Sequence, residues 1–470
     1  MFDPQKYPVI QGGMGVGVSG PCLAKAVSLS GGIGTVSLTA APHLLADALK
    51  KGDLKGDYRR ALKHFPFPEI AQRVLDDYFV QYGTSIESKT VPMFNLNPSR
   101  KIMELALCAA FALVWLAKEG HENPVFANLL EKIQLPHIVC IFGAMLAGLD
   151  GLVVGAGLPR HIPEVIDAIL EGREVTYPID IVNSKDKAVM KLNLQDFLVG
   201  MDIPKMKRPM FLAIVSSSGL AKYLARSKKV DGFIVELATA GGHNAPPRGK
   251  EWRFDKEENL LYDPIEDRVN FEELKSLGLP FWIGGSFALP KKLNEARKLG
   301  ACGVQVGTHF ALCNESGIKS GYKREMILDI LNGNLKIWTS STVSPTGFPF
   351  KVALRDGSLS DPEVYDGRPR VCGMGYLREL CTVDGKLVYR CPAEPVDDYI
   401  RKGGRCEDTV GRACLCSGLS AAVGVGSDCE PPIFTLGDIA KDANILRQII
   451  KPGRISYSAS DVMESLLKPC

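Results

Sequence analysis

One histidine of the sequence follows directly after two glycines at the end of an apolar run. Residues 235–249 read VELATAGGHNAPPRG, and His243 is one of only seven histidines in the chain. An unperturbed imidazole has a pKa near 6.5, so it can take a proton from a substrate or give one near neutral pH. The bare backbone at Gly241 and Gly242 allows a bound molecule to approach closely. This setting makes His243 a candidate for proton transfer, whereas a lone histidine is more often structural.

Two further glycine loops have the composition of an anion site. FWIGGSFALPKKL puts Gly284 and Gly285 between an apolar run and a helical pattern, and GVQVGTHFAL does the same with Gly307 and Thr308. Glycines expose backbone N–H groups and a following helix adds its positive dipole end, so both loops suit a phosphate. An isolated Gly-Gly pair is more often a plain turn, but two such loops in succession favour a phosphate site.

A third glycine-rich segment, VIQGGMGVGVSGPCLAKAV, lies near the N-terminus. No acidic residue stands at the distance that a dinucleotide-binding fingerprint requires, which argues against a Rossmann fold. The segment does offer exposed backbone at Met14 and Gly15, where the polar edge of a planar cofactor could pair.

The elements that must position these residues are short apolar runs that alternate with helical patterns, which is typical of parallel βα units. The expected strands are residues 9–13, 34–38, 92–97, 151–157, 210–216, 232–238, 281–285 and 303–308. Eight such units predict an α/β fold with a closed (β/α)8 TIM barrel. In this architecture the active site lies on the loops at the C-terminal ends of the strands, where the glycine loops and His243 fall.

One such barrel requires about 250 residues, and the chain of 470 residues is much longer. We expect a barrel over residues 1–345 with insertions at about 45–90 and 160–208, and a cysteine-rich C-terminal extension or lid subdomain over 346–470. Part of the second insertion, VTYPIDIVNSKDKAVMKLNLQDFL, alternates apolar and polar residues and predicts a hairpin.

The composition excludes some classes of partner. With 46% hydrophobic and 23% charged residues the chain is typical of globular proteins, and 56 basic against 53 acidic residues give no broad charged face for nucleic acid or a membrane surface. The N-terminus lacks the pattern of a signal peptide, which predicts a cytoplasmic protein. The apolar stretch 105–117 is too short to span a bilayer and predicts a buried helix. The sequence leaves open whether the chain forms a homo-oligomer.

Eight of the thirteen cysteines lie beyond residue 370. An odd number of cysteines without an export signal predicts free thiols. Cys391, Cys406, Cys414 and Cys416 could supply four thiolates, but their scattered spacing is not that of a zinc ribbon. We therefore expect no metal in the extension.

Several segments together resemble the nitronate monooxygenase family, formerly called 2-nitropropane dioxygenases. In chain order they are VIQGGMGVGVSGPCLAKAVSLSGGIG, FNL, GLVVGAGLP, DGFIVELATAGGHNAP, PFWIGGSFALPKKLNEARKLGACGVQVGTHF and TSSTVSPTGFPFKV. They cover most of residues 8–355 apart from the insertions, and the joint occurrence of AGGH, GLP and QVGT is more specific than any one of them. The related flavin-dependent enoyl-acyl-carrier-protein reductases of bacteria share most of these segments.

The resemblance implies a TIM barrel that binds FMN non-covalently and uses His243 as its catalytic residue. The cofactor residues that it implies are Gln11 and Asn95 along the site, Gly13, Met14 and Gly15 at the isoalloxazine ring, Gly241 and Gly242 beside the cofactor, and Gly284, Gly285, Gly307 and Thr308 at the phosphate. After the histidine the family commonly continues with arginine and glycine, whereas this chain reads NAPPRG over 244–249. That departure leaves the substrate open.

The leading hypothesis is an FMN-dependent monooxygenase that carries out the oxidative denitrification of alkyl nitronates with O2. The alternative within enzymes is the NAD(P)H-dependent reduction of an enoyl thioester such as enoyl-acyl-carrier protein, in which His243 gives the proton. A second alternative is a non-catalytic barrel that binds FMN as a scaffold or sensor. The first two hypotheses imply a small-molecule substrate.

Overall fold

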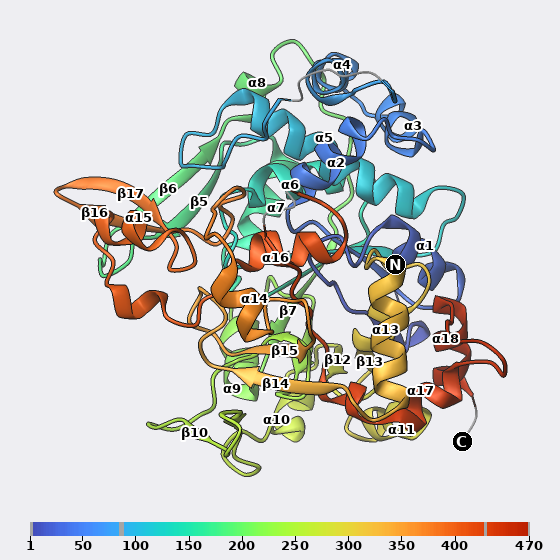
Figure 1. Cartoon of the computed structure of the whole chain (residues 1–470). Coiled ribbons are helices and arrows are strands. Elements are labelled where there is room, and N and C mark those ends of the chain that lie inside the picture. The colour runs from blue at the N-terminus through green and yellow to red at the C-terminus, as the bar shows by residue number, and fades with distance from the viewer. Residues whose placement is uncertain (1–2, 84–88, 427–429, 469–470) are drawn as a thin grey trace.

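The structure is a computed structural model that describes residues 3–83, 89–426 and 430–468. Its centre is a ring of eight parallel strands surrounded by helices (Figure 1), so the predicted TIM-barrel fold is confirmed. The strands follow one another around the ring in the order β1, β13, β12, β8, β7, β4, β3, β2. Their bounds are β1 Val9–Gln11, β2 Gly34–Ser37, β3 Val125–Leu130, β4 Gly151–Gly155, β7 Met210–Val215, β8 Gly232–Glu236, β12 Phe281–Gly284 and β13 Gly303–Val306.

The ring closes between β1 and the residue that precedes β2. The Gln11 N–H donates to the Ile33 carbonyl at 2.9 Å, and the Ile33 N–H donates to the Val9 carbonyl at 2.9 Å. Ile10 and Ile33 form a parallel bridge at the same place. This closure leaves the barrel without an open sheet edge.

Apolar side chains fill the part of the barrel interior that lies towards the N-terminal ends of the strands. Phe126, Leu212, Ile234 and Trp282 belong to one buried cluster, and the Trp282 Nε1–H donates to the Tyr7 carbonyl at 3.0 Å. Residues two positions apart on a strand face the same side. The residues two positions further along these strands therefore also face inward, at the C-terminal end of the barrel where a cavity can form.

Seven of the eight predicted strands are present, and the strand predicted over 92–97 is wrong. That segment is irregular, because Pro92 and Pro98 interrupt the backbone donors that a strand in the ring needs. The third strand is β3, which follows the long helix α5 (Arg100–Lys118).

The apolar stretch 105–117 lies within α5 and is buried almost throughout, as predicted. The helix packs against α2 (Ala41–Lys50) and α6 (His137–Leu146). Within the described ranges we find no helix with the length and apolar character that crossing a membrane requires.

The remaining helices surround the barrel or belong to the additions to it. Along the barrel they are α1 Pro21–Leu29, α7 Ile162–Glu171, α9 Ser218–Ala225, α10 Phe271–Ser276, α11 Pro290–Lys298, α12 Thr308–Leu312 and α13 Ser320–Leu331. The first insertion adds α3 Asp57–Lys63 and α4 Pro68–Tyr78. The C-terminal part adds α14 Pro362–Gly367, α15 Val396–Arg401, α16 Leu415–Ala422, α17 Ala443–Ile449 and α18 Ala459–Leu467, of which α18 returns to pack on α1 and α11.

The second insertion forms the predicted hairpin, with β5 (Val175–Asp180) antiparallel to β6 (Lys187–Leu192) and followed by α8 (Leu194–Phe197). A second hairpin, β16 (Glu379–Val383) with β17 (Lys386–Arg390), comes from the extension. The Val182 N–H donates to the Leu380 carbonyl at 2.8 Å, so the insertion and the extension are in contact.

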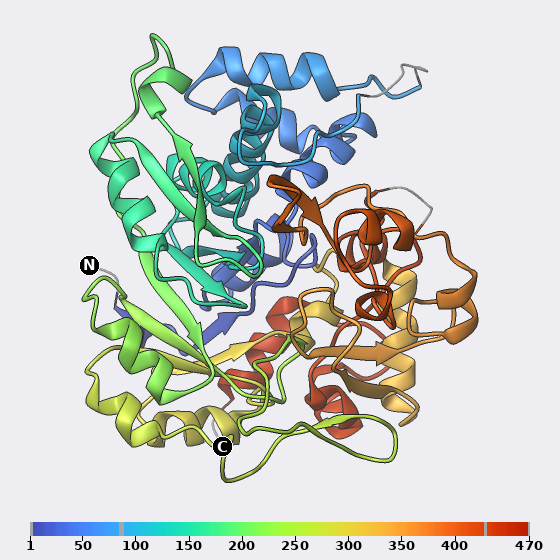
Figure 2. The ribbon, with the colours of Figure 1, turned by 90° about the vertical axis from the view of Figure 1, so that its left-hand side faces the viewer.

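The extension lies along one side of the barrel, where its orange and red elements are seen in Figure 2. A small antiparallel sheet joins the two parts, in the order β14 (Lys336–Ser340), β15 (Phe350–Leu354) and β9 (Gly242–His243). Because β14 precedes residue 345 and β15 follows it, this sheet crosses the expected boundary. The division of the chain into 1–345 and 346–470 stays a prediction.

Barrel closure generates a first prediction. A Cβ at Gly303 would lie 1.9 Å from the Pro8 carbonyl oxygen, next to β1. Gly303→Ala must therefore displace β1, and we expect it to lower the free energy of unfolding by about 1–3 kcal/mol or more.

The matched control is Gly321→Ala in α13, where a Cβ meets nothing within 4 Å. This change should leave stability unchanged or raise it slightly. Urea unfolding of both variants is the measurement, and equal midpoints for the two would contradict the packing described here.

Candidate functional site

A cavity opens at the C-terminal ends of the strands. It has about 1720 Å³ of unfilled space, part of it open to solvent. The extension supplies part of the wall through residues that include Tyr376, Leu415, Cys416, Leu419, Ile433 and Thr435.

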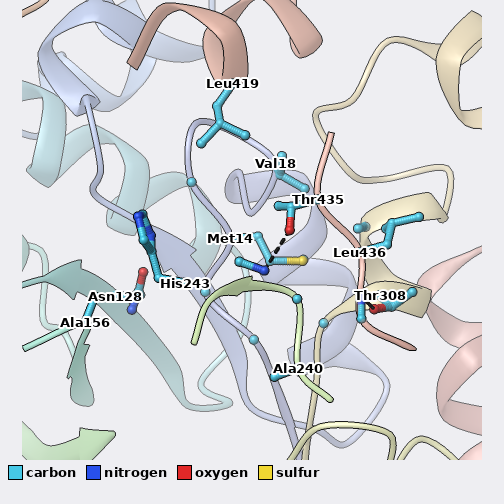
Figure 3. A pocket seen from close by; sticks show the side chains of 18 of the residues that line it. Met14, Val18, Asn128, Ala156, Ala240, His243, Thr308, Leu419, Thr435 and Leu436 are labelled. Atoms are coloured by element: carbon cyan, nitrogen blue, oxygen red, sulfur yellow. Dashed lines mark hydrogen bonds between the residues drawn. The ribbon is translucent and has the colours of Figure 1, made fainter. Parts of the chain in front are cut away.

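The residues predicted for the site, with the exception of Gln11 and Asn95, line this cavity. They are Gly13, Met14, Gly15, Gly241, Gly242, His243, Gly284, Gly285, Gly307 and Thr308. Figure 3 shows His243 on one side of the cavity, Thr308 on the other side and Met14 between them. The loops after β1, β8, β12 and β13 are thereby brought together, as the barrel architecture predicts.

Gln11 is buried behind the cavity wall. Its side chain donates to the Ser19 hydroxyl at 2.7 Å and accepts from the Thr35 N–H at 2.8 Å. Gln11 therefore shapes the loop that follows β1, instead of lining the cavity as we expected.

Asn95 does not line the cavity either, because residues 92–97 form an irregular segment instead of a barrel strand, and Asn95 is exposed there. Asn128, in the middle of β3, lines the cavity and donates to the Val153 carbonyl at 3.2 Å. The signal for Asn128 was one polar residue within the apolar run VFANLL.

Glycine is required at these positions for different structural reasons. Gly242 has a φ of +82° and Gly285 a φ of +100°, conformations that L residues rarely adopt. A Cβ at Gly13 would lie 2.1 Å from the Asn128 Cβ. A Cβ at Gly241 would lie 2.9 Å from the Gly437 nitrogen, so the close neighbour of Gly241 is the extension.

We expected His243 to lie at the end of a barrel strand, but it lies in the short strand β9. It pairs there with Phe350, whose ring lies edge-on to the imidazole with 4.9 Å between the centroids. Its Nε2 lies 2.7 Å from the Ser344 hydroxyl. Its Nδ1 has no hydrogen-bond partner within the described parts of the chain and is available to a substrate.

The electrostatics of the cavity keep two titratable groups neutral. Burial, with a smaller effect from the Lys132 charge, lowers the pKa of His243 to about 4. Burial raises the pKa of Glu236, at the end of β8, to about 8. At neutral pH the cavity therefore holds a neutral imidazole that can accept a proton and a protonated carboxyl group that can donate one.

The loop after β12 has the donors that a phosphate needs. The backbone N–H groups of Ser286 and Phe287 donate to no acceptor within the described residues, and the buried Thr239 hydroxyl has no partner. The Thr239 oxygen lies 2.9 Å from the position of a Cβ at Gly285. Buried polar groups are normally hydrogen-bonded, so this arrangement fits the phosphate of FMN.

The loop that follows His243 is tied to its surroundings. The Asn244 N–H donates to the Pro349 carbonyl at 2.9 Å, and the Arg248 guanidinium donates to the Ser216 carbonyl at 3.0 Å and to the Glu266 carbonyl at 2.9 Å. Residues 244–249, which follow His243 directly, are thus held in place by hydrogen bonds to three other segments.

The cysteines of the extension only partly cluster. Cys391, Cys414 and Cys416 pack together, whereas Cys406 is exposed. All the cysteines of the described parts are free thiols, as predicted, while Cys429 and Cys470 lie outside the described residues. The described residues contain no group of three His, Cys, Asp or Glu side chains arranged to hold a metal ion.

Comparison with known proteins adds a family match. Residues 201–340 match the family model described as Nitronate monooxygenase. This range includes His243 and the loops after β12 and β13, so the resemblance that the sequence indicates is confirmed there. No curated protein matches the chain.

One solved structure supports the fold, and two others are also similar to this chain. FabK from Thermotoga maritima has a TM-score of 0.50 at 14% sequence identity and covers 98% of this chain and 92% of its own. Nitroalkane oxidase from Streptomyces ansochromogenes has a TM-score of 0.45 at 13% identity, with 98% and 94% covered. The enoyl reductase domain of MlnA from Bacillus amyloliquefaciens has a TM-score of 0.47 at 12% identity, with 98% and 93% covered.

The environment of His243 generates a prediction about its titration. Its imidazole should stay neutral from pH 8 to about pH 5, because its pKa is about 4. Lys132→Met should raise this pKa by removing the nearby positive charge, although burial will still hold it below 6.5. NMR titration of the histidine ring protons measures both values.

The same shift sets the sign of the effect on stability. Since folding favours neutral His243, its contribution is complete above pH 6.5 and is lost as the pH falls towards 4. A His243 pKa near 6.5 in the folded protein would contradict this description of the site.

Proposed function

We propose that the protein is an FMN-dependent oxidoreductase that converts alkyl nitronates, and the nitroalkanes from which they form, to carbonyl compounds and nitrite with O2 as the oxidant. The observation that carries the proposal is the position of His243. Its ring is neutral and has a free Nδ1, and it faces the same cavity as three glycine loops that fit a flavin phosphate and ring.

The residues that would hold FMN come from five loops or strands. Met14 and the glycines beside it, with Asn128, would border the ring. The N–H groups of Ser286 and Phe287 and the hydroxyls of Thr239 and Thr308 would bind the phosphate. FMN, when bound, would accept the electrons that leave the substrate.

The protein's own part in the reaction is to take a proton and to hold the resulting anion. For Nδ1 to act as the base, Nε2 must carry the ring proton and donate it to the Ser344 hydroxyl 2.7 Å away, so Ser344 would fix the productive tautomer. The charge of Lys132, which already disfavours imidazolium, would favour the anionic nitronate.

A second candidate is the NAD(P)H-dependent reduction of an enoyl thioester. The part of the cavity wall that comes from the extension is largely apolar and includes Leu415, Leu419 and Ile433, which suits an acyl chain. We expected His243 to give the proton in this reaction, but its imidazole is neutral at neutral pH. Glu236 would be the proton donor instead, because its carboxyl group is protonated there. In both candidates we propose that residues 346–470 act as a lid over a barrel formed by 1–345.

The two forms of the substrate give a test. A nitronate has already lost the proton that His243 would remove. We expect His243→Asn to lower kcat/KM for the neutral nitroalkane by about 10²–10⁴-fold and to affect the preformed nitronate far less. Nitrite release from each substrate by the FMN-loaded protein is the measurement.

The matched control is His64→Asn, since His64 is exposed and stacks on Trp115 away from the cavity. This variant should behave as the wild type with both substrates. Equal losses for the nitroalkane and the nitronate in His243→Asn would rule out the role of His243 as the base.

A further inference from the structure

A segment of the extension lies directly on the predicted cofactor residues. Residues 433–438, here called the strap, cross from the loop after β8 to the beginning of α12. In Figure 3 Thr435 of the strap is drawn between His243 and Thr308, and Leu436 is drawn next to Thr308. Five residues of the strap, 433–437, line the cavity.

Two hydrogen bonds join the strap to these residues through threonine hydroxyls. The Gly242 N–H donates to Thr435 Oγ1 at 2.7 Å, and the Gly437 N–H donates to Thr308 Oγ1 at 2.9 Å. A hydroxyl that accepts a hydrogen bond keeps its own proton for donation. Neither hydroxyl donates to an acceptor in the described parts of the chain, so both keep a free proton in the cavity wall.

Backbone packing brings the strap close to the same loop. A Cβ at Gly437 would lie 2.8 Å from the Thr239 carbonyl oxygen, and a Cβ at Gly241 would lie 2.9 Å from the carbonyl carbon of Leu436. The Asp438 N–H donates to the Thr239 carbonyl at 3.0 Å. The contact between the strap and the loop after β8 therefore requires glycine at both 241 and 437.

The other side of the strap is anchored to β15. The Ala353 N–H donates to the Phe434 carbonyl at 2.9 Å. The buried Lys351 ammonium lies 3.1 Å from the Asp438 carboxylate and donates to the Thr339 hydroxyl at 2.8 Å. Lys351 pairs with Gly242 in the small sheet, so one strand holds both the strap and the loop of His243.

We propose, on the basis of the proposed function, that the strap forms a wall of the flavin site and that Thr435 is a binding residue for FMN. The Thr435 hydroxyl accepts its hydrogen bond from Gly242, which precedes His243 and is not part of the phosphate loops. The Thr435 hydroxyl would therefore donate its proton to the ring or the ribityl part of the flavin. The Gly437 N–H, by occupying one lone pair of Thr308, directs that hydroxyl proton to the phosphate.

The test is the affinity of the full chain for flavin after the bound flavin has been removed. Thr435→Val and Thr435→Ala remove the hydroxyl and should weaken the binding of FMN by about 3- to 10-fold, and Thr435→Ser should restore it to within about twofold. Quenching of flavin fluorescence measures Kd. The control is Thr382→Val on the exposed face of β16, which should bind as the wild type.

Riboflavin, which lacks the phosphate, is the second probe. The loss in Thr435→Val should be the same for riboflavin as for FMN, which a general loosening of the phosphate loops would not produce. Wild-type affinity or tighter binding in a folded Thr435→Ala variant would overturn the proposal, as would a loss confined to FMN. Failure of the wild type to bind FMN would instead overturn the proposed function itself.

Discussion

The close approach of two backbone segments determines the geometry of the whole site. Gly241 and Gly437 lie against each other with no space for a side chain on either, although almost two hundred residues separate them in the chain. This contact fixes the loop that ends at His243, because the next residue, Gly242, bonds Thr435 in the strap and pairs with Lys351 in β15. The barrel supplies one side of the cavity, and the extension holds His243 in place on the other side.

Burial then sets the chemistry that the cavity can support. Removal of water disfavours charge, so His243 is neutral and Glu236 is protonated at neutral pH. A neutral base close to the ammonium of Lys132 suits the removal of a proton from a carbon acid, because the product is an anion. The same cavity holds a carboxylic acid as a proton donor, which keeps reduction of an enoyl thioester as the competing chemistry.

The sequence predicts most of the barrel because seven of its eight strands are recognisable as local apolar runs, several of which end in glycine. The glycine loops and His243 follow from the same local pattern. The prediction from local pattern is wrong at Asn95. FNL at 94–96 and FANLL at 126–130 are alike in composition, and only their packing shows that the second segment belongs to a barrel strand. The strap could not be predicted either, because its sequence, IFTLGD, has no strand or helix period and its contacts are with residues distant in sequence.

The central claim is that bound FMN takes electrons from a nitronate, and anaerobic stopped-flow mixing of the FMN-loaded protein tests it most directly. A preformed alkyl nitronate should bleach the visible absorbance of the flavin rapidly, while NADH and NADPH should do so slowly or not at all. Fast bleaching by NADH or NADPH with none by nitronates would contradict the account and favour the enoyl reductase.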